Sequence, residues 1–210
     1  MKCGGSDTTS GLACNPVAGW AADAIIAHGG SAVFSETAEL IGAKHVMAKW
    51  AADGGVARRI YEVVSRMEKR ISDAGVVIRG SEPTPGNIQG ALTTLEEKSF
   101  GAIAKGGTTP LRGVLEWGER LNGKGLFFMD GSANTVQMSL GLASAGAQLM
   151  TFGFGGGLPA RFHSVPACSL GALPILPVIK ILNSPKDARE KEYFGIYAGT
   201  IIEGQESILR

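Results

Sequence analysis

The chain has 210 residues, and its 20 Lys and Arg residues nearly balance its 19 Asp and Glu residues, for a net charge of +1. Because no basic run is interleaved with aromatic residues, this balance argues against nucleic acid or an anionic membrane surface as a partner. A hydrophobic content of 44% argues against disorder, and the length suits one well-buried α/β domain.

The cysteines and the apolar segments indicate the cellular compartment of the protein. Cys3, Cys14 and Cys168 are odd in number and have no paired spacing, which is typical of a reducing environment. The start of the chain has no apolar signal region. The longest apolar stretch, residues 173–182, contains two prolines and a lysine and is too short to span a bilayer. We therefore expect a cytoplasmic protein with no membrane partner.

The first half of the chain predicts two helices and one short strand. Asn15 as N-cap and Pro16 at the first helical position open a helix that ends at His28-Gly29-Gly30. A strand at residues 32–34 follows and runs into Ser35-Glu36-Thr37. Residues 56–73 have apolar residues at helical spacing and a charged outer face, which predicts a second helix.

The second half predicts further alternation. Residues 83–90 contain two prolines and two glycines and are expected to form an ordered loop. A capping box at residues 94–97 opens a helix that runs to about Ala104. A buried strand at 126–129 ends in Asp130, and a helix of small residues is expected at 133–145. Strands at 148–152 and 177–182 complete the pattern, with a glycine loop at 153–157 after the first of them.

Strands alternating with helices predict an α/β fold, in which a single domain holds a mostly parallel sheet flanked by helices in Rossmann-like layers. Ligands of such sheets bind at the carboxyl ends of the strands. This rule brings Ser35-Glu36, Asp130-Gly131 and the 153–157 loop to one edge. The 31 glycines, roughly twice the usual share of ~7%, suit tight turns and backbone-lined ligand sites there.

The opening hexapeptide, Lys2 to Asp7, combines a cation, a thiol, two glycines, a hydroxyl and a carboxylate. It is either an inert terminus or an active-site loop of a longer protein, and we favour the active-site loop. The Cys3 thiolate is a candidate metal ligand or acid, and the alternative is a small buried residue. Asp7 suits a metal or a substrate hydroxyl, and equally suits a turn or a cap.

A series of short segments occurs in order along nearly the whole chain: KCGGSD (2–7), NP (15–16), SE (35–36), PGN (85–87), TTLEEKS (93–99), GAIAKGG (101–107), TFGFGGG (151–157), PVIKI (177–181), and AG before the final GQESI. Together they resemble the C-terminal domain of the altronate/galactarate dehydratase family. The loops near residues 152–155, 161–173 and 195–199 depart from the family pattern, which leaves the substrate open.

The resemblance implies a lyase that removes water from a hydroxylated sugar acid to give a 2-keto-3-deoxy acid, with a divalent metal, iron(II) or manganese. It further implies that residues 1–210 are the C-terminal catalytic domain. N-terminal domains of the same protein, or a separate small subunit, would then complete the enzyme, and a homo-oligomer stays open. A relative in the family, sulfolactate sulfo-lyase, eliminates sulfite, so that reaction is an alternative. An acid- or metal-binding module without catalysis is an alternative of another class.

The site residues follow from the matching motifs and from the groups that dehydration needs, namely a base, an electrophile and an acid. The candidates are Glu36, Glu97, Lys98 and Lys105 as catalytic residues, Lys2, Gly4, Gly5, Ser6, Asn87, Gly155 and Gly156 as substrate-binding residues, and Cys3 and Asp7 as metal ligands.

These candidates also have structural interpretations. Glu36 suits the start of a helical turn and Lys105 a helix end, where each complements the helix dipole. Glu97 completes the capping box. Lys98 would be a solvated surface charge, and Asn87 a turn residue that tolerates the left-handed conformation. Because no H-E-x-x-H or paired-cysteine spacing occurs, metal ligands cannot be assigned by spacing.

Overall fold

A computed structural model describes residues 2–3, 14–89, 91–131, 135–154, 169–170, 173–174, 178–182 and 196–197. Its strands confirm the α/β class. One parallel sheet has the order β2 (Ser31–Ser35), β4 (Gly125–Met129), β3 (Leu111–Leu115). A second parallel sheet has the order β1 (Lys2–Cys3), β5 (Met150–Phe154), β8 (Val178–Leu182), β9 (Ile196–Tyr197). The strands β6 (Ser169–Leu170) and β7 (Leu173–Pro174) form an antiparallel pair.

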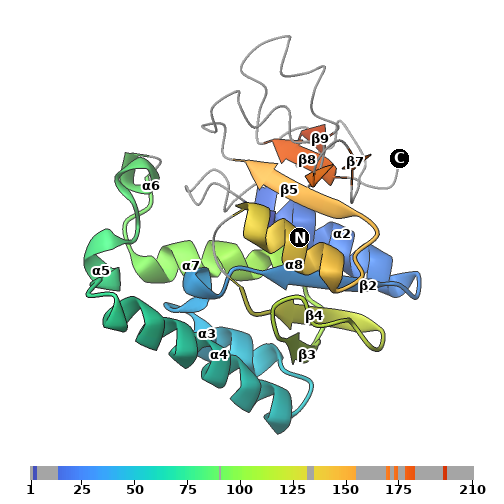
Figure 1. Ribbon diagram of the computed structural model, residues 1–210, viewed down its shortest axis with the longest axis horizontal. Coiled ribbons are helices and arrows are strands. Elements are labelled where there is room, and N and C mark those ends of the chain that lie inside the picture. Colours follow the sequence, from blue (N-terminus) through green and yellow to red (C-terminus); the bar gives the residue numbers. More distant parts are fainter. Residues whose placement is uncertain are drawn as a thin grey trace.

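Helices pack against these sheets, and some of them lie between the two parallel ones (Figure 1). The longer ones are α2 (Cys14–Ala27), α4 (Gly54–Asp73), α7 (Leu95–Ile103) and α8 (Thr135–Ser144). The short ones are α3 (Lys44–Met47), α5 (Ile78–Ser81) and α6 (Pro85–Gln89). Three 3₁₀ turns, η1 (Thr37–Leu40), η2 (Ala48–Trp50) and η3 (Ala104–Gly106), join them. None of the described helices is both long and apolar enough to cross a membrane.

The four longer helices and the strands β2, β4, β5 and β8 are found as predicted, although these strands lie in two parallel sheets instead of one. Other elements differ locally. The first helix begins at Cys14, so Asn15 lies inside it and donates its side-chain amide to the Gly101 carbonyl at 2.6 Å instead of acting as N-cap. The expected loop at residues 83–90 contains α6, because Pro85 suits a first helical position. Strand β3 was not predicted, since its five residues include Arg112 and Gly113 and show no clear alternation.

The core lies on both faces of β4, all of whose residues are buried. Leu126 and Phe128 pack into one cluster with residues of β2, η1 and α4, and the Phe128 ring meets Phe34 edge to face at 5.2 Å. Phe127 and Met129 point the other way, into a cluster with α8. This alternation is the period of two that a strand imposes. The covered sheet therefore leaves its strand ends as the places where polar groups collect.

Candidate active site

Glu36 follows β2 directly, where the sequence analysis expects a functional acid. Its backbone is left-handed, with φ 99° and ψ 74°, although it carries a full side chain. A non-glycine residue in this region costs on the order of 1–3 kcal/mol, so its surroundings must hold it there. The Glu36 side chain is 3% exposed, and its Oε2 accepts a hydrogen bond from Lys105 Nζ at 2.5 Å.

Lys105 lies in η3, directly after α7, and its side chain is only 1% exposed. Its ammonium also donates to Glu39 Oε2 at 3.1 Å. Glu39 belongs to η1, the turn that follows Glu36. A buried lysine thus lies between two carboxylates that come from one strand end. The interpretation of Lys105 as a helix-end charge does not describe this environment.

Lys98 lies on α7, seven residues before Lys105, which is two helical turns and brings both lysines to the same side. Its side chain is 8% exposed, so it is not a solvated surface charge. Lys98 Nζ lies 2.5 Å from Glu82 Oε2 and 4.0 Å from Glu39 Oε1. It also donates to Asn87 Oδ1 at 3.1 Å.

These side chains form what we call the ionic row: Glu36, Lys105, Glu39, Lys98 and Glu82. Acids and bases alternate along it, and it rises from the interior toward solvent, since Glu39 is 12% and Glu82 29% exposed. Figure 1 shows α5, α6 and α7, which lie near the outer members, grouped beyond one end of β2. The end of β2 and the packing of helices therefore bring together groups from three segments of the sequence, namely residues 36–39, residue 82 and residues 98–105.

Close backbone contacts hold the row in place. A Cβ built on Gly42 would lie 2.9 Å from Glu96 Cα, so η1 and α7 approach closely only because Gly42 has no side chain. The Gly42 amide also donates to Ser99 Oγ at 3.0 Å. A Cβ on Gly19 of α2 would lie 2.3 Å from the carbonyl oxygen of Ala104, the residue before Lys105 in η3. Substitution of either glycine would push apart the segments that carry the row.

Glu97 has the structural role that its position predicts. Its amide donates to Thr94 Oγ1 at 3.1 Å, and its carboxylate accepts from the amide and the hydroxyl of Thr93 at 2.9 and 2.8 Å. The bonds from Thr93 hold the pKa of the Glu97 carboxyl below its usual value. A catalytic role for Glu97 stays a prediction.

Asn87 lies in α6 and its side-chain oxygen accepts from both the amide and the hydroxyl of Thr84, at 3.0 and 2.8 Å. The same oxygen accepts from Lys98, so Asn87 joins the outer end of the ionic row. The alternative interpretation as a turn residue does not apply, because Asn87 is helical, and its role in substrate binding stays a prediction.

The opening hexapeptide lies partly outside the described residues. Lys2 and Cys3 form β1 and pair in parallel with Phe152 and Gly153, which brings this motif beside the strand that enters the glycine loop. The predicted site residues Gly4, Gly5, Ser6, Asp7, Gly155 and Gly156 lie outside the described residues. Among the side chains that the structure describes, no three histidines, cysteines or acids form a group suited to a metal ion. The metal ligands Cys3 and Asp7 stay predictions.

Sequence reasoning missed Glu39 and Glu82. Glu39 lies three residues after Glu36, a spacing that places both side chains on one face of a helical turn, and this signal was present in the sequence. Glu82 has no such signal, because its contact with Lys98 spans 16 residues and depends on how α5 and α7 pack.

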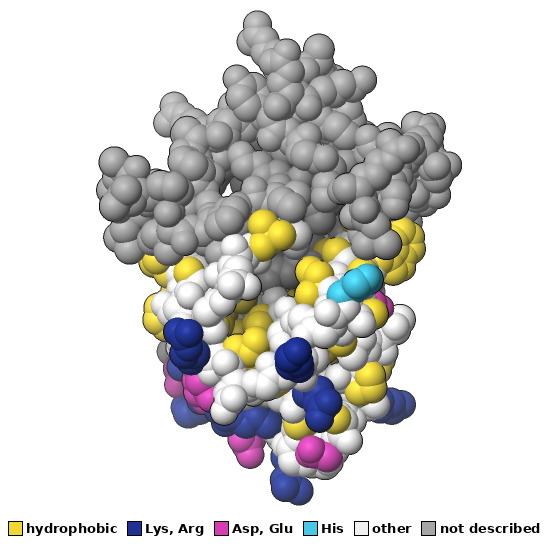
Figure 2. Space-filling model, turned by 90° about the vertical axis from the view of Figure 1, so that its right-hand side faces the viewer, with side chains coloured by type: hydrophobic (Ala, Val, Ile, Leu, Met, Phe, Trp, Pro, Cys, Tyr) yellow, Lys and Arg dark blue, Asp and Glu magenta, His cyan; other side chains and the backbone are white. Residues whose placement is uncertain are grey.

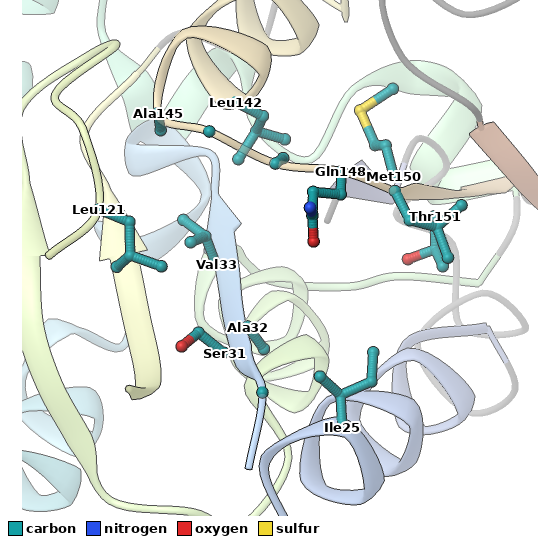
Figure 3. A pocket seen from close by; sticks show the side chains of 14 residues that line it. Ile25, Ser31, Ala32, Val33, Leu121, Leu142, Ala145, Gln148, Met150 and Thr151 are labelled. Carbon is teal, nitrogen blue, oxygen red and sulfur yellow. The ribbon is translucent and has the colours of Figure 1, made fainter. Parts of the chain in front are cut away.

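A separate cavity of about 440 Å³ lies between β2 and β5. It is lined mainly by apolar residues, among them Ile25, Val33 and Met150 (Figure 3). Residues 30–33 and 148–151 belong to the amino ends of these strands, opposite the end that leads to Glu36. Figure 2, which views the right-hand side of Figure 1, shows hydrophobic side chains within a hollow on its face. The cavity therefore offers few polar groups and none of the ionic row.

The fold and this site define a class, that of α/β domains with charged groups at the carboxyl ends of parallel strands. Comparison with known proteins then identifies the family. All of residues 1–210 match the family model described as D-galactarate/altronate dehydratase, C-terminal. The chain belongs to this family, as the sequence resemblance predicts.

Individual relatives carry different names. The chain is 38% identical over 190 residues to the (2R)-sulfolactate sulfo-lyase subunit beta of Chromohalobacter salexigens, a match that covers 90% of this chain and 46% of the relative. It is 32% identical over 206 residues to the altronate dehydratase of Escherichia coli, covering 98% and 39%. It is 32% identical over 209 residues to the galactarate dehydratase (L-threo-forming) of the same organism, covering 99% and 38%. The chain thus spans less than half the length of these relatives.

Proposed function

We propose that this chain is the catalytic domain of a hydro-lyase that dehydrates a hydroxylated sugar acid to a 2-keto-3-deoxy acid. The observation that carries the proposal is the buried lysine Lys105 held between Glu36 and Glu39 at the carboxyl end of β2. Burying such ion pairs is rarely a gain in stability over apolar packing. A role in catalysis therefore explains these buried charged groups at a strand end better than a contribution to the stability of the fold does.

The reaction needs a base for the proton next to the carboxylate and a positive group for the enediolate that forms. Glu36 is the proposed base, because its carboxylate is held in a fixed place at the carboxyl end of β2, where ligands of parallel sheets bind. The α carbon–hydrogen bond breaks and the proton passes to Glu36. Lys105 stabilises the negative charge that develops on the substrate carboxylate oxygens.

Elimination then breaks the bond between the β carbon and its hydroxyl oxygen. A proton must reach that oxygen for water to leave, and the ammonium group of Lys105 is the proposed donor. The enol that remains then tautomerises to the keto acid, because its β carbon takes up a proton and its hydroxyl group releases one. Over both stages two protons are removed and two are supplied, so the net change is the loss of water.

Lys98 is the proposed partner of the substrate carboxylate. With every member ionised, the two lysines and three glutamates of the ionic row carry a formal charge of −1. A carboxylate substrate adds to this negative charge, so one glutamate has to leave. Glu82 is the most exposed of the three, and it already occupies the position on Lys98 that a substrate carboxylate would take.

The resemblance implies a metal, iron(II) or manganese, for which the described residues hold no group of three candidate His, Cys or acid ligands. Cys3 and Asp7 remain the proposed ligands. Because the relatives are longer than this chain, we further propose that other domains of the same protein, or a separate small subunit, complete the site.

A second candidate is a carbon–sulfur lyase that releases sulfite from sulfolactate. It is favoured by the relative named as a sulfolactate sulfo-lyase subunit, to which 38% of 190 residues are identical. The two reactions share proton removal and enediolate stabilisation, and they differ in the leaving group.

The test is an assay for keto acid and for sulfite with the protein at its full natural length. The panel contains aldonates, aldarates and sulfolactate, each with iron(II), with manganese and with chelator. We expect keto acid from at least one sugar acid, and its loss in Glu36→Gln. Glu68→Gln, which changes an acid paired with Lys44 away from the row, is the matched control. Sulfite release without turnover of any sugar acid would favour the second candidate, and inactivity on the whole panel would contradict both.

A further inference from the structure

Four hydrogen bonds join the chain around Glu36 to the end of β4. Ser35 Oγ donates to the Met129 carbonyl at 2.5 Å, and the Thr37 amide donates to the Gly131 carbonyl at 3.1 Å. The Gly131 amide donates back to Thr37 Oγ1 at 3.0 Å, and that hydroxyl donates to Asp130 Oδ1 at 2.5 Å. Both neighbours of Glu36 are therefore tied to the adjacent strand.

The Asp130 carboxylate is also held in place by a hydrogen bond from α4. Asp130 is 4% exposed, and its other oxygen, Oδ2, accepts from Arg66 Nη2 at 2.5 Å. Arg66 comes from α4, and its guanidinium is held by a second acid, because Nη2 also donates at 2.7 Å to Oε2 of Glu116, the residue after β3. A chain of polar contacts thus runs from α4 through Asp130 to Thr37, and it ends one residue from Glu36.

The left-handed backbone of Glu36 shows what this chain of contacts supports. With φ at 99°, the backbone of Glu36 is in a region that a residue with a side chain rarely adopts. Bonds at Ser35 and Thr37 fix the chain on both sides of it. Without them, Glu36 would relax to an ordinary conformation and its carboxylate would turn away from Lys105.

We propose that Thr37 and Asp130 are positioning residues that hold Glu36 in its left-handed conformation and so keep its carboxylate on Lys105. The proposal rests on the proposed role of Glu36 as the base. Neither Thr37 nor Asp130 is required to touch the substrate. Their effect is expected on the rate of the chemical step and not on substrate affinity, because a base displaced by about 1 Å can lose on the order of 100-fold in rate.

A matched pair of variants separates positioning from general stability. Thr37→Val keeps the shape of the side chain and removes the hydroxyl that both accepts from Gly131 and donates to Asp130. Thr37→Ser keeps the hydroxyl and removes a methyl group. In the protein at full natural length, we expect Thr37→Val to lower kcat by about 10- to 100-fold with little change in KM. Thr37→Ser is expected to restore most of kcat, although it also loses packing.

Equal loss of kcat in both variants would overturn the proposal, and so would a Thr37→Val enzyme that has lost thermal stability but turns over normally when folded. If Thr37→Val does not fold, Asp130→Asn is the second variant, since it keeps the volume and an acceptor oxygen while weakening the contact with Arg66. The expected result is again a lower kcat at similar KM, and unchanged kcat would overturn the proposal.

A readout that needs no substrate keeps this proposal separate from the proposed function. The crystal structure of Thr37→Val should show Glu36 with negative φ and its carboxylate away from Lys105. A structure that retains φ near +99° and the contact with Lys105 would overturn the positioning role, even in an active enzyme. Conversely, a wild-type protein that acts on no hydroxy acid would contradict the proposed function alone.

Discussion

Two clusters of acids and bases in this molecule use the same chemical groups in different surroundings. The ionic row lies at the carboxyl end of β2, and its lysines are 1% and 8% exposed. The second cluster joins Arg59 and Arg66 of α4 to Glu116 after β3, with side chains 34%, 36% and 45% exposed. In the second cluster water screens the charges, so each pair contributes little. In the buried ionic row water does not screen the charges. Removal of one member of an ion pair therefore leaves the other buried without a counter-charge, which destabilises the folded protein.

The two clusters also differ in what we expect them to contribute, namely activity for the ionic row and stability for the exposed cluster. The exposed cluster ties α4 to the residue after β3, and Arg66 also reaches Asp130, so it supports the row from outside without forming part of it. The buried row places a lysine between two acids beside a strained backbone, at the edge of the sheet where ligands bind. The following predictions test this division, from the largest expected effect to the smallest.

Removal of the innermost ion pair should have the largest effect. Glu36→Gln should lower kcat by at least about 100-fold, within the range that general bases contribute, while the protein stays folded. Lys105→Met should lower activity as strongly and also destabilise the protein by about 3–5 kcal/mol, because it leaves Glu36 and Glu39 buried without their shared cation. Steady-state kinetics and urea unfolding measure both. Wild-type rates in Glu36→Gln would remove the basis for treating the row as an active site.

Changes at the outer end of the row should act on affinity. Lys98→Met should raise KM, by about 10- to 100-fold if a charged hydrogen bond of roughly 1.5–3 kcal/mol is lost. Glu82→Gln should lower KM, because it weakens the internal carboxylate that competes for Lys98. Lys69→Met is the control, since Lys69 pairs with Asp73 on the exposed face of α4. A rise in KM for Glu82→Gln would show that Glu82 helps to bind the substrate.

A change at the start of α4, the helix that carries Arg59 and Arg66, should alter the stability of the protein and not its activity. Asp53 caps α4 by accepting from the amides of Gly55 and Val56 at 2.7 and 2.9 Å. Asp53→Ala should destabilise the protein by about 1 kcal/mol, as expected for loss of an N-cap. Thermal unfolding measures the loss, and kcat per folded molecule should stay at the wild-type value. A large fall in kcat would mean that the start of α4 affects the geometry of the ionic row as well as the stability of the protein.

The exposed cluster itself should show a small dependence on pH. Its hydrogen bond from Arg66 lowers the pKa of the Glu116 carboxyl below its usual value of 4.5, against a smaller opposing effect of desolvation. The stabilisation is therefore complete above the carboxyl pKa of the unfolded chain and is lost as the pH falls through the lower pKa of the folded protein.

Glu116→Gln should remove this contribution, which is below about 1 kcal/mol because the pair is exposed. Urea unfolding of the variant and the wild type at neutral pH and at roughly pH 3 measures it, with a difference that shrinks in acid. A difference that grows in acid would mean that Glu116 is stabilised when protonated.

Much of the candidate site was predicted from the sequence, and the reason differs from residue to residue. Glu36 was expected at a strand end, and the Glu97 capping box was read correctly, because both depend on local patterns. The resemblance to the family added Lys98, Lys105 and Asn87. Their surroundings were not predicted, since Lys98 was equally interpretable as a solvated charge. Burial depends on which segments pack over a side chain, and no local pattern contains that information.

The sequence by itself determined the four longer helices, the strands β2, β4, β5 and β8, the meeting of Ser35-Glu36 with Asp130-Gly131, and membership of a family. Periodicity, helix caps and collinear motifs are patterns within short stretches of sequence, so they can be recognised without knowledge of the fold. Only the tertiary structure decided that Lys105 is shared by Glu36 and Glu39, that Glu82 lies on Lys98, and that Thr37 reaches Asp130. The last of these contacts joins residues 93 positions apart. Such contacts form only when parallel strands and α7 bring distant segments to one edge, where a low dielectric strengthens each of them.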